Sequence, residues 1–228
     1  MAYREDRDLE FLAYCSNEDL NDLVYLLTHD PEDGKTRNTE ELTSSQNYRR
    51  YYPDHQKYWQ DIAAEIQTFG ANTIATIFRL GKGVLYKEIL CDACEDMKVN
   101  FNKSSSTKAI EKNLLDKVYT QAIEDLSEEQ KKEVLQSLDL PTTNLSNQAL
   151  TASLQAALLN VNFSPIVFMN FAPIFLQQTL LGRLLGIATG PIGWGLTTMW
   201  TVSDLAGPAK RVTIPAVIQI AMLRRKYS

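Results

Sequence analysis

Histidine and cysteine are scarce in this chain of 228 residues, which has two histidines and three cysteines. A small, odd number of cysteines, together with a charged N-terminus that lacks an apolar signal segment, predicts a reducing compartment. The net charge of −5 gives no reason to expect nucleic acid as a partner. We therefore expect a cytoplasmic protein that does not bind nucleic acid.

Two of the cysteines, Cys91 and Cys94, form a CxxC motif. Redox-active CxxC motifs usually follow a strand, and structural zinc usually needs a second ligand pair. The only other soft ligands are Cys15, His29 and His55. Core packing, zinc binding and redox work stay open as alternatives; core packing is favoured, because a helix places both thiols on nearly one face.

No familiar catalytic spacing accompanies the two histidines. A histidine titrates near neutral pH, so His55 could act as a general base, but no serine, cysteine or carboxylate stands at a recognisable distance from it. We expect His29 to cap a helix C-terminus and His55 to be solvated at a helix N-terminus. We expect exposed helix faces to carry Glu40, Glu41, Glu65 and Glu88. The sequence thus predicts no catalytic, cofactor-binding or metal-binding residue, and it favours a non-enzymatic protein.

Strand alternation is missing as well, and apolar residues recur at helical spacing instead. Ser16 is expected to cap a helix that buries Leu20, Leu23, Val24 and Leu27. Trp59, Ile62, Ala63, Ile66 and Phe69 share a face of a second helix, and Gly70 is expected just after its end. One further helix is predicted over 83–99, one begins at Thr107, and one begins with a capping box at Ser127. Four more are predicted over 148–159, 165–187, 191–203 and 212–226. The predicted fold is an all-α, multi-helix globular bundle.

Charge is divided unevenly along the chain. Residues 141–228 carry six basic residues and one acid, whereas residues 1–140 carry 17 basic residues and 27 acids. Between Asp139 and Arg183 no charged residue occurs. This asymmetry predicts two regions: an acidic amphipathic helical region over 1–140, and an apolar, weakly basic helical region over 141–228 that packs on it.

Five of the ten glycines lie in the stretch LLGRLLGIATGPIGWG. Gly182, Gly186 and Gly190 are four residues apart, a spacing that lets two helices approach closely. We expect an apolar, glycine-rich helical hairpin, in which Gly190 and Pro191 form the corner and Trp194 begins the second helix.

Membrane insertion is the competing interpretation of this hairpin. The uncharged runs 161–182 and 184–203 are each long enough to span a bilayer. Against spanning stand the amide side chains of the first run, the glycine-proline break and a mean hydropathy of −0.24. A buried soluble core is favoured; conditional insertion, with attachment to the inner membrane, and permanent spanning are the alternatives.

A short aromatic and basic cluster comprises Tyr48, Arg49, Arg50, Tyr51 and Tyr52. Such side chains could stack on bases or bind a phosphate. Because the cluster is short and lies in the acidic region, a role in contacting a partner or anchoring a loop is favoured.

The whole chain resembles the uncharacterised bacterial YaaW-like family. The resemblance lies in LLTHD with GKTR (26–37), HQKYWQDIAAEIQTFG (55–70), GKGVLYKEIL (81–90) and RVTIPAVIQIAMLRR (211–225). This family has a distant link to ubiquinol–cytochrome c chaperone-like helical domains. The resemblance implies a bacterial, intracellular, mostly helical protein, and it supplies no catalytic residues.

We therefore expect a non-enzymatic protein-interaction or chaperone-like assembly protein, with a protein partner and no cofactor. The alternative is a membrane-active effector whose 161–203 hairpin inserts into a bilayer on triggering.

Overall fold

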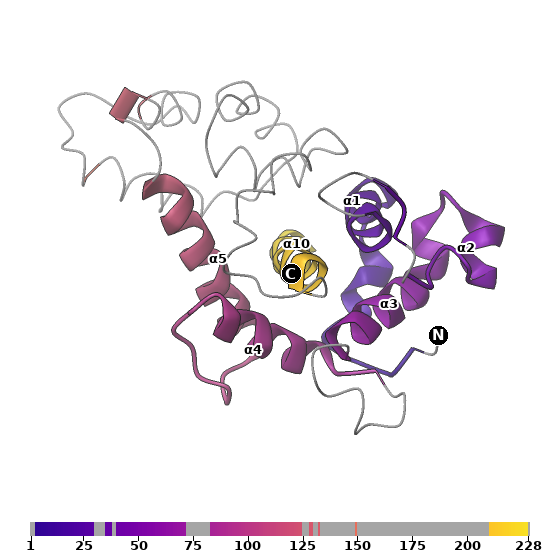
Figure 1. Ribbon diagram of the computed structural model, residues 1–228, viewed down its shortest axis with the longest axis horizontal. Helices are drawn as coiled ribbons and strands as arrows, with labels where there is room; N and C mark the ends of the chain where they lie inside the picture. The colour runs from indigo at the N-terminus through magenta and orange to yellow at the C-terminus, as the bar shows by residue number, and fades with distance from the viewer. Residues whose placement is uncertain are drawn as a thin grey trace. The chain divides into compact units, whose positions relative to one another are not determined.

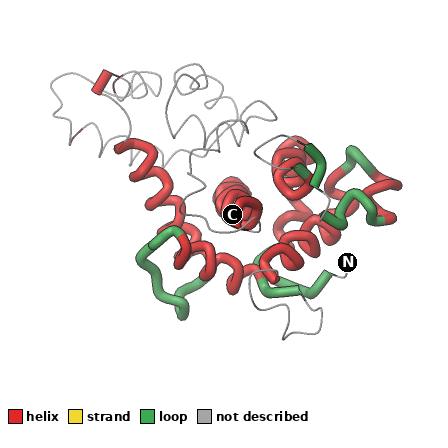
Figure 2. The backbone as a smooth tube through the Cα atoms, in the orientation of Figure 1, coloured by secondary structure: helices red, strands yellow, loops and turns green. Residues whose placement is uncertain are grey.

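The computed structural model describes residues 3–29, 35–37, 40–71, 83–124, 128, 129, 132, 149 and 210–227. Within these ranges the chain forms helices joined by loops, and no strand occurs beyond one isolated bridge between His29 and Thr36 (Figure 2). The predicted all-α class is confirmed. The elements, in order, are the 3-10 helix η1 (Glu10–Tyr14), α1 (Asn17–Thr28), α2 (Gln46–Tyr51), the 3-10 helix η2 (His55–Tyr58), α3 (Trp59–Ala71), α4 (Tyr86–Asp96), α5 (Thr107–Glu124) and α10 (Lys210–Tyr227).

The chain divides into two compact units, and the first unit is discontinuous in sequence. It comprises Met1–Leu114 and Trp200–Ser228, whereas the second unit comprises Leu115–Met199. Apart from the end of α5 (115–124) and residues 128, 129, 132 and 149, the described residues belong to the first unit.

The last helix, α10, lies in the middle of the first unit. It contacts η1, α1, α3 and α4, and Figure 1 shows it end-on between α1 and α4. A helix that has neighbours on several sides must be apolar around most of its circumference. Most buried residues of α10 are accordingly apolar: Val212, Ile214, Ala216, Val217, Ile218, Ile220, Ala221 and Leu223. Gln219 and Arg224 of this helix are buried as well.

Helix α1 begins as the sequence predicts. The Ser16 hydroxyl oxygen accepts the Asp19 backbone N–H at 3.1 Å, which satisfies one of the free donors of the first turn. Leu20, Leu23, Val24 and Leu27 are all buried, as their spacing predicts. After α1 the chain turns back, and the Arg37 N–H donates to the Thr28 carbonyl at 2.9 Å.

Helix α3 departs from its predicted end. It continues through Gly70 to Ala71, so the expectation that Gly70 follows the helix is wrong. A glycine inside a helix costs only about 1 kcal/mol relative to alanine, which packing along the helix can outweigh. Ile62, Ala63 and Ile66 are buried as predicted.

Several predictions lie outside the described residues and stay predictions. They include the boundary between residues 140 and 141, the capping box at Ser127, the helices at 148–159, 165–187 and 191–203, and the hairpin residues Gly182, Gly186, Gly190, Pro191 and Trp194. The helix predicted over 212–226 is confirmed by α10. No helix within the described part of the chain is both long and apolar enough to cross a membrane.

Candidate functional site

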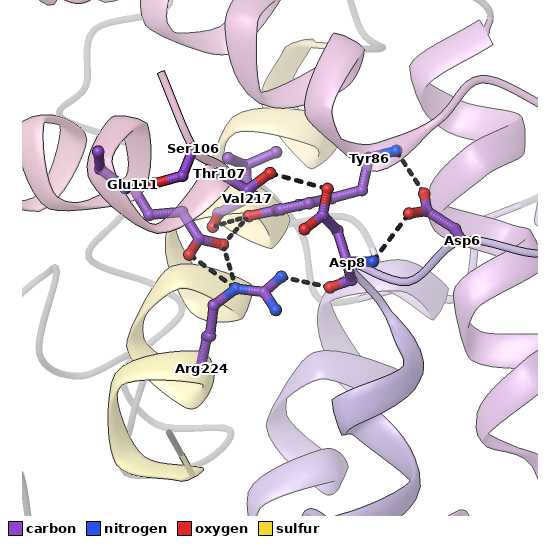
Figure 3. Close-up of polar contacts among 9 residues, drawn as sticks. Asp6, Asp8, Tyr86, Ser106, Thr107, Glu111, Val217 and Arg224 are labelled. Carbon is purple, nitrogen blue, oxygen red and sulfur yellow. Dashed lines mark hydrogen bonds and ion pairs between the residues drawn. The ribbon is translucent and has the colours of Figure 1, made fainter. Parts of the chain in front are cut away.

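A buried polar cluster, which we call the Arg224 cluster, joins four segments of the first unit (Figure 3). Arg224 of α10 points its guanidinium at Glu111 of α5, and Nε lies 2.7 Å from Oε2 and 3.0 Å from Oε1. The Tyr86 hydroxyl of α4 donates to the same carboxylate at 2.8 Å. Arg224 Nη2 also donates to the backbone carbonyl of Asp8. The members of the cluster are Asp6, Asp8, Tyr86, Thr107, Glu111 and Arg224.

Two aspartates of the N-terminal segment extend the cluster to the starts of α4 and α5. Asp6 Oδ2 accepts the backbone N–H of Tyr86, the first residue of α4, at 2.6 Å. Asp8 Oδ2 accepts the Thr107 hydroxyl at the first residue of α5 at 2.7 Å. A carboxylate at a helix N-terminus interacts favourably with the helix dipole, and Asp6 also satisfies a free backbone N–H group of α4. The N-terminal segment therefore holds two helix starts in place.

The electrostatics of the cluster indicate a structural role. Burial raises the pKa of Glu111, and the Arg224 guanidinium offsets part of this rise. Burial also raises the pKa of Tyr86 well above its ordinary value, so its hydroxyl stays a neutral donor. The guanidinium lies 4.4 Å from the Phe11 ring centroid. Among the described residues, no buried side-chain atom of the cluster lacks a hydrogen bond. With its donors and acceptors engaged internally, the cluster ties helices together.

The last turn of α10 makes a second set of polar contacts, with the first turn of α1. Lys226 Nζ lies 2.7 Å from Asp19 Oδ2, and the Tyr227 hydroxyl donates to the same carboxylate. The Ser16 N–H donates to the Tyr227 oxygen at 2.8 Å. Although burial raises the pKa of Asp19, hydrogen bonds from Lys226, Tyr227 and Ser16 bring it below its ordinary value. Asp19 is therefore held as a carboxylate beside Lys226.

All three cysteines are buried and free. Burial raises the pKa of Cys15 and of Cys94 to about 12, and it raises the pKa of Cys91 as well. Because the thiolate is the reactive form, such thiols are poor nucleophiles at neutral pH. No group of three metal-ligating side chains occurs among the residues that the structure describes. These features favour core packing for the CxxC motif.

Glu40 and Glu41 lie in the loop before α2 and not on a helix face, so that expectation is wrong. Two further sequence expectations about titratable residues are wrong as well. His55 is only 2% exposed rather than solvated; its Nδ1 is hydrogen-bonded to the Tyr58 hydroxyl, and burial lowers its pKa. Glu65 is 1% exposed rather than on a wet face, and burial raises its pKa to about 8. The two oxygens of Glu65 accept the Glu41 N–H at 3.3 Å each. The loop that contains Glu41 and the buried Leu42 therefore lies against this side of α3.

The predicted partner-contact residues come together on a surface, which we call the α2 surface: Tyr48, Arg49, Arg50, Tyr51 and Tyr52. Helix α2 buries none of its residues, and Tyr52, which follows it, is 56% exposed. In Figure 1, α2 lies at the edge of the first unit and α10 near its middle. Arg49 and Arg50 occupy the last turn, where positive charge complements the helix dipole.

The α2 surface is held in place by contacts on its inner side. Ser45 caps α2 by accepting the Tyr48 N–H at 3.1 Å, and its hydroxyl donates to Asp61 of α3 at 2.8 Å. The Tyr48 ring packs edge-on against the buried Tyr58, with 5.4 Å between centroids. The helix is therefore a fixed platform whose outer side chains face solvent.

The sequence draws attention to the residues of the α2 surface, whose role as a partner contact stays a prediction, but it gives almost no sign of the Arg224 cluster. Composition alone marks the α2 surface, because tyrosines and arginines are adjacent there. Arg224 and Glu111 look like ordinary helix charges, and no local pattern links residues that far apart in the chain. The one available signal was the position of Arg224 on an otherwise apolar helix.

Comparisons with known proteins identify the family. Residues 3–38 match the model of a domain of unknown function (DUF3944). The chain is 42% identical to a UPF0174 protein of Helicobacter pylori strain J99, across 99% of this chain and 94% of that protein. It is 38% identical to the UPF0174 protein YaaW of Escherichia coli K12, across 99% and 97% respectively. No solved structure matches. These matches confirm the predicted resemblance, and the chain belongs to the UPF0174 family.

Proposed function

We propose that this protein is a non-enzymatic helical interaction protein, acting in assembly, that binds a protein partner through the α2 surface. The observation that carries the proposal is the exposure of adjacent arginines and tyrosines on a short helix that is fixed from its inner side. Tyrosine and arginine are enriched at the energetically dominant positions of protein interfaces.

The distribution of polar groups supports this proposal over an enzymatic one. The Arg224 cluster engages its donors and acceptors with one another, and the cysteines are buried with raised pKa values. In contrast, the arginines of the α2 surface point outward. Among the described residues, neither Arg49 nor Arg50 forms an ion pair with a carboxylate. The surface is thus available for contact, and its rigid rings lose little conformational entropy on binding.

Affinity capture from a bacterial lysate, with the full chain as bait, tests the proposal. We expect the wild type to retain a specific protein that the double variant Arg49→Glu/Arg50→Glu captures at least about ten-fold less well, since two interface arginines are reversed in charge. The control is Lys108→Glu/Lys112→Glu, which makes the same charge change at exposed positions of α5 and should capture normally. Equal capture by all three proteins, or no reproducible capture by the wild type, would contradict the proposal.

Membrane insertion is the second candidate function, and a sequence feature favours it. The uncharged runs 161–182 and 184–203 stand in tandem around Arg183. Vesicles containing anionic lipid test it by flotation and dye release at neutral and acidic pH. If the hairpin inserts, the protein should float with the vesicles. Gly186→Leu should reduce the floating fraction, because the larger side chain crowds the contact between the two helices. Absence of both flotation and leakage under all these conditions would rule out this function.

A further inference from the structure

We infer that the partner presents an acidic peptide segment to the α2 surface, with carboxylates that bind Arg49 and Arg50. This inference rests on the proposed function and names the chemistry of the partner. It is drawn from the placement of charges around α2.

Positive charge gathers around one ring of the α2 surface. The Arg50 guanidinium carbon lies 5.3 Å and the Lys57 ammonium 5.7 Å from the centroid of the Tyr51 ring. Arg49, the neighbour of Arg50, is exposed as well. The chain as a whole carries a net charge of −5, so two adjacent exposed arginines are a local exception to its acidic character.

The carboxylates around α2 are committed to other groups. Glu40 accepts the Thr43 N–H at 2.8 Å and the Thr43 hydroxyl. Asp61 accepts the Ser45 hydroxyl at 2.8 Å and the Asn47 amide at 3.4 Å. Asp54 lies 2.9 Å from Lys57 and accepts the Asn17 amide at 3.2 Å. Lys57 is therefore neutralised locally, whereas Arg49 and Arg50 are left with uncompensated charge. An incoming anion would pair with these two guanidinium groups.

The geometry of guanidinium indicates which anion fits. Arginine binds carboxylates through two parallel N–H···O bonds, which are stronger than neutral hydrogen bonds. The rings of Tyr51 and Tyr52 beside it offer apolar contact and a hydroxyl, which suits a peptide side chain next to the acidic residue. An acidic segment that also carries an aromatic or aliphatic residue complements all of these groups.

A short peptide suits this surface better than an extended polyanion. Nucleic acids and anionic membranes present many charges over a wide area, so their binding scales with the overall field of the protein. That field is negative here, since residues 1–140 carry 27 acids against 17 basic residues. A peptide that covers only the α2 surface meets the local positive charge without approaching the remaining acids.

Selection from a library of short random peptides displayed on phage, with the intact protein as the target, tests the inference. We expect peptides selected on the wild type to be enriched in Asp and Glu relative to the unselected library. The affinity of a selected peptide, measured by fluorescence anisotropy, should fall about ten-fold in Arg49→Gln/Arg50→Gln. It should be unchanged in Lys108→Gln/Lys112→Gln. Replacing the acids of that peptide by their amides should weaken binding to the same degree.

The inference is overturned if no acidic enrichment appears, or if the amide peptide binds as tightly as the acidic one. Binding of phosphatidylglycerol vesicles through Arg49 and Arg50, without acidic peptide enrichment, would also overturn it in favour of a membrane surface. These outcomes differ from failure of the proposed function. If lysate capture depends on the two arginines while acidic peptides are not selected, the interaction surface stands and only the acidic chemistry is wrong.

Discussion

Replacing Arg224 by methionine should lower the free energy of unfolding by about 3–5 kcal/mol, because the change leaves the Glu111 carboxylate buried without its cation. The Asp8 carbonyl loses a donor at the same time, while the Tyr86 hydroxyl still reaches Glu111. Burial would then raise the pKa of Glu111 with only the Tyr86 hydrogen bond left to oppose the rise, so the variant should lose further stability as the pH rises from the acidic range. Urea unfolding followed by circular dichroism measures the effect.

A second substitution separates the buried charge from the loss of packing. The double variant Arg224→Met/Glu111→Leu removes both charges and should recover at least half of the lost stability, since an apolar pair can replace a buried ion pair. Arg225→Met, at the half-buried neighbouring position, serves as the control and should change stability by less than about 0.5 kcal/mol. If Arg224→Met cost no more than Arg225→Met, the central role of the cluster would be refuted.

Replacing Glu65 by glutamine should stabilise the protein at alkaline pH and leave its stability near pH 4 almost unchanged. The pKa of this carboxyl is about 8 in the folded protein, against an ordinary value of 4.5. Below pH 4.5 the carboxyl is largely neutral in both the folded and the unfolded protein. As the pH rises towards 8, the unfolded chain releases the proton first, so the wild type loses stability by up to roughly 4 kcal/mol. Glutamine does not titrate and avoids this loss.

Thermal unfolding across the range from pH 4 to pH 9 tests this prediction. The stability difference between Glu65→Gln and the wild type should grow with pH and level off above pH 8. Other groups that titrate in this range, such as Asp22 with a pKa of about 7, are present in both proteins and cancel in the difference. Glu5→Gln, at an exposed position of the N-terminal segment, is the matched control. A difference that does not vary with pH would contradict the burial of an ionisable carboxyl at residue 65.

Features encoded by neighbouring residues could be predicted from the sequence. The Ser16 cap and the spacing of Leu20, Leu23 and Leu27 specify α1 within one stretch of chain, and the structure has that helix with those leucines buried. The helix over 212–226 follows from local periodicity in the same way. The family, too, was recognisable from stretches of sequence spread along the chain.

Burial of polar side chains could not be predicted, because it depends on which segment covers which helix. Glu65 lies under the loop that contains Glu41 and Leu42, and the pattern of α3 gives no sign of that loop. The pairing of Arg224 with Glu111 follows from the insertion of α10 among earlier helices. A hydrophobic pattern predicts that a helix face is buried, but it does not indicate which segment of the chain covers that face.

The central position of α10 has a consequence for synthesis on the ribosome. Residues 1–114 leave the ribosome long before α10, since the whole second unit, Leu115–Met199, is translated between them. Until α10 emerges, α1, α3 and α4 lack the helix that fills the space among them, and Glu111 lacks its cation. Domains that are continuous in sequence can fold one after another during translation. This first unit is discontinuous, so its apolar helix faces stay uncovered until translation has passed residue 227. The nascent chain is most exposed to misassembly during that interval.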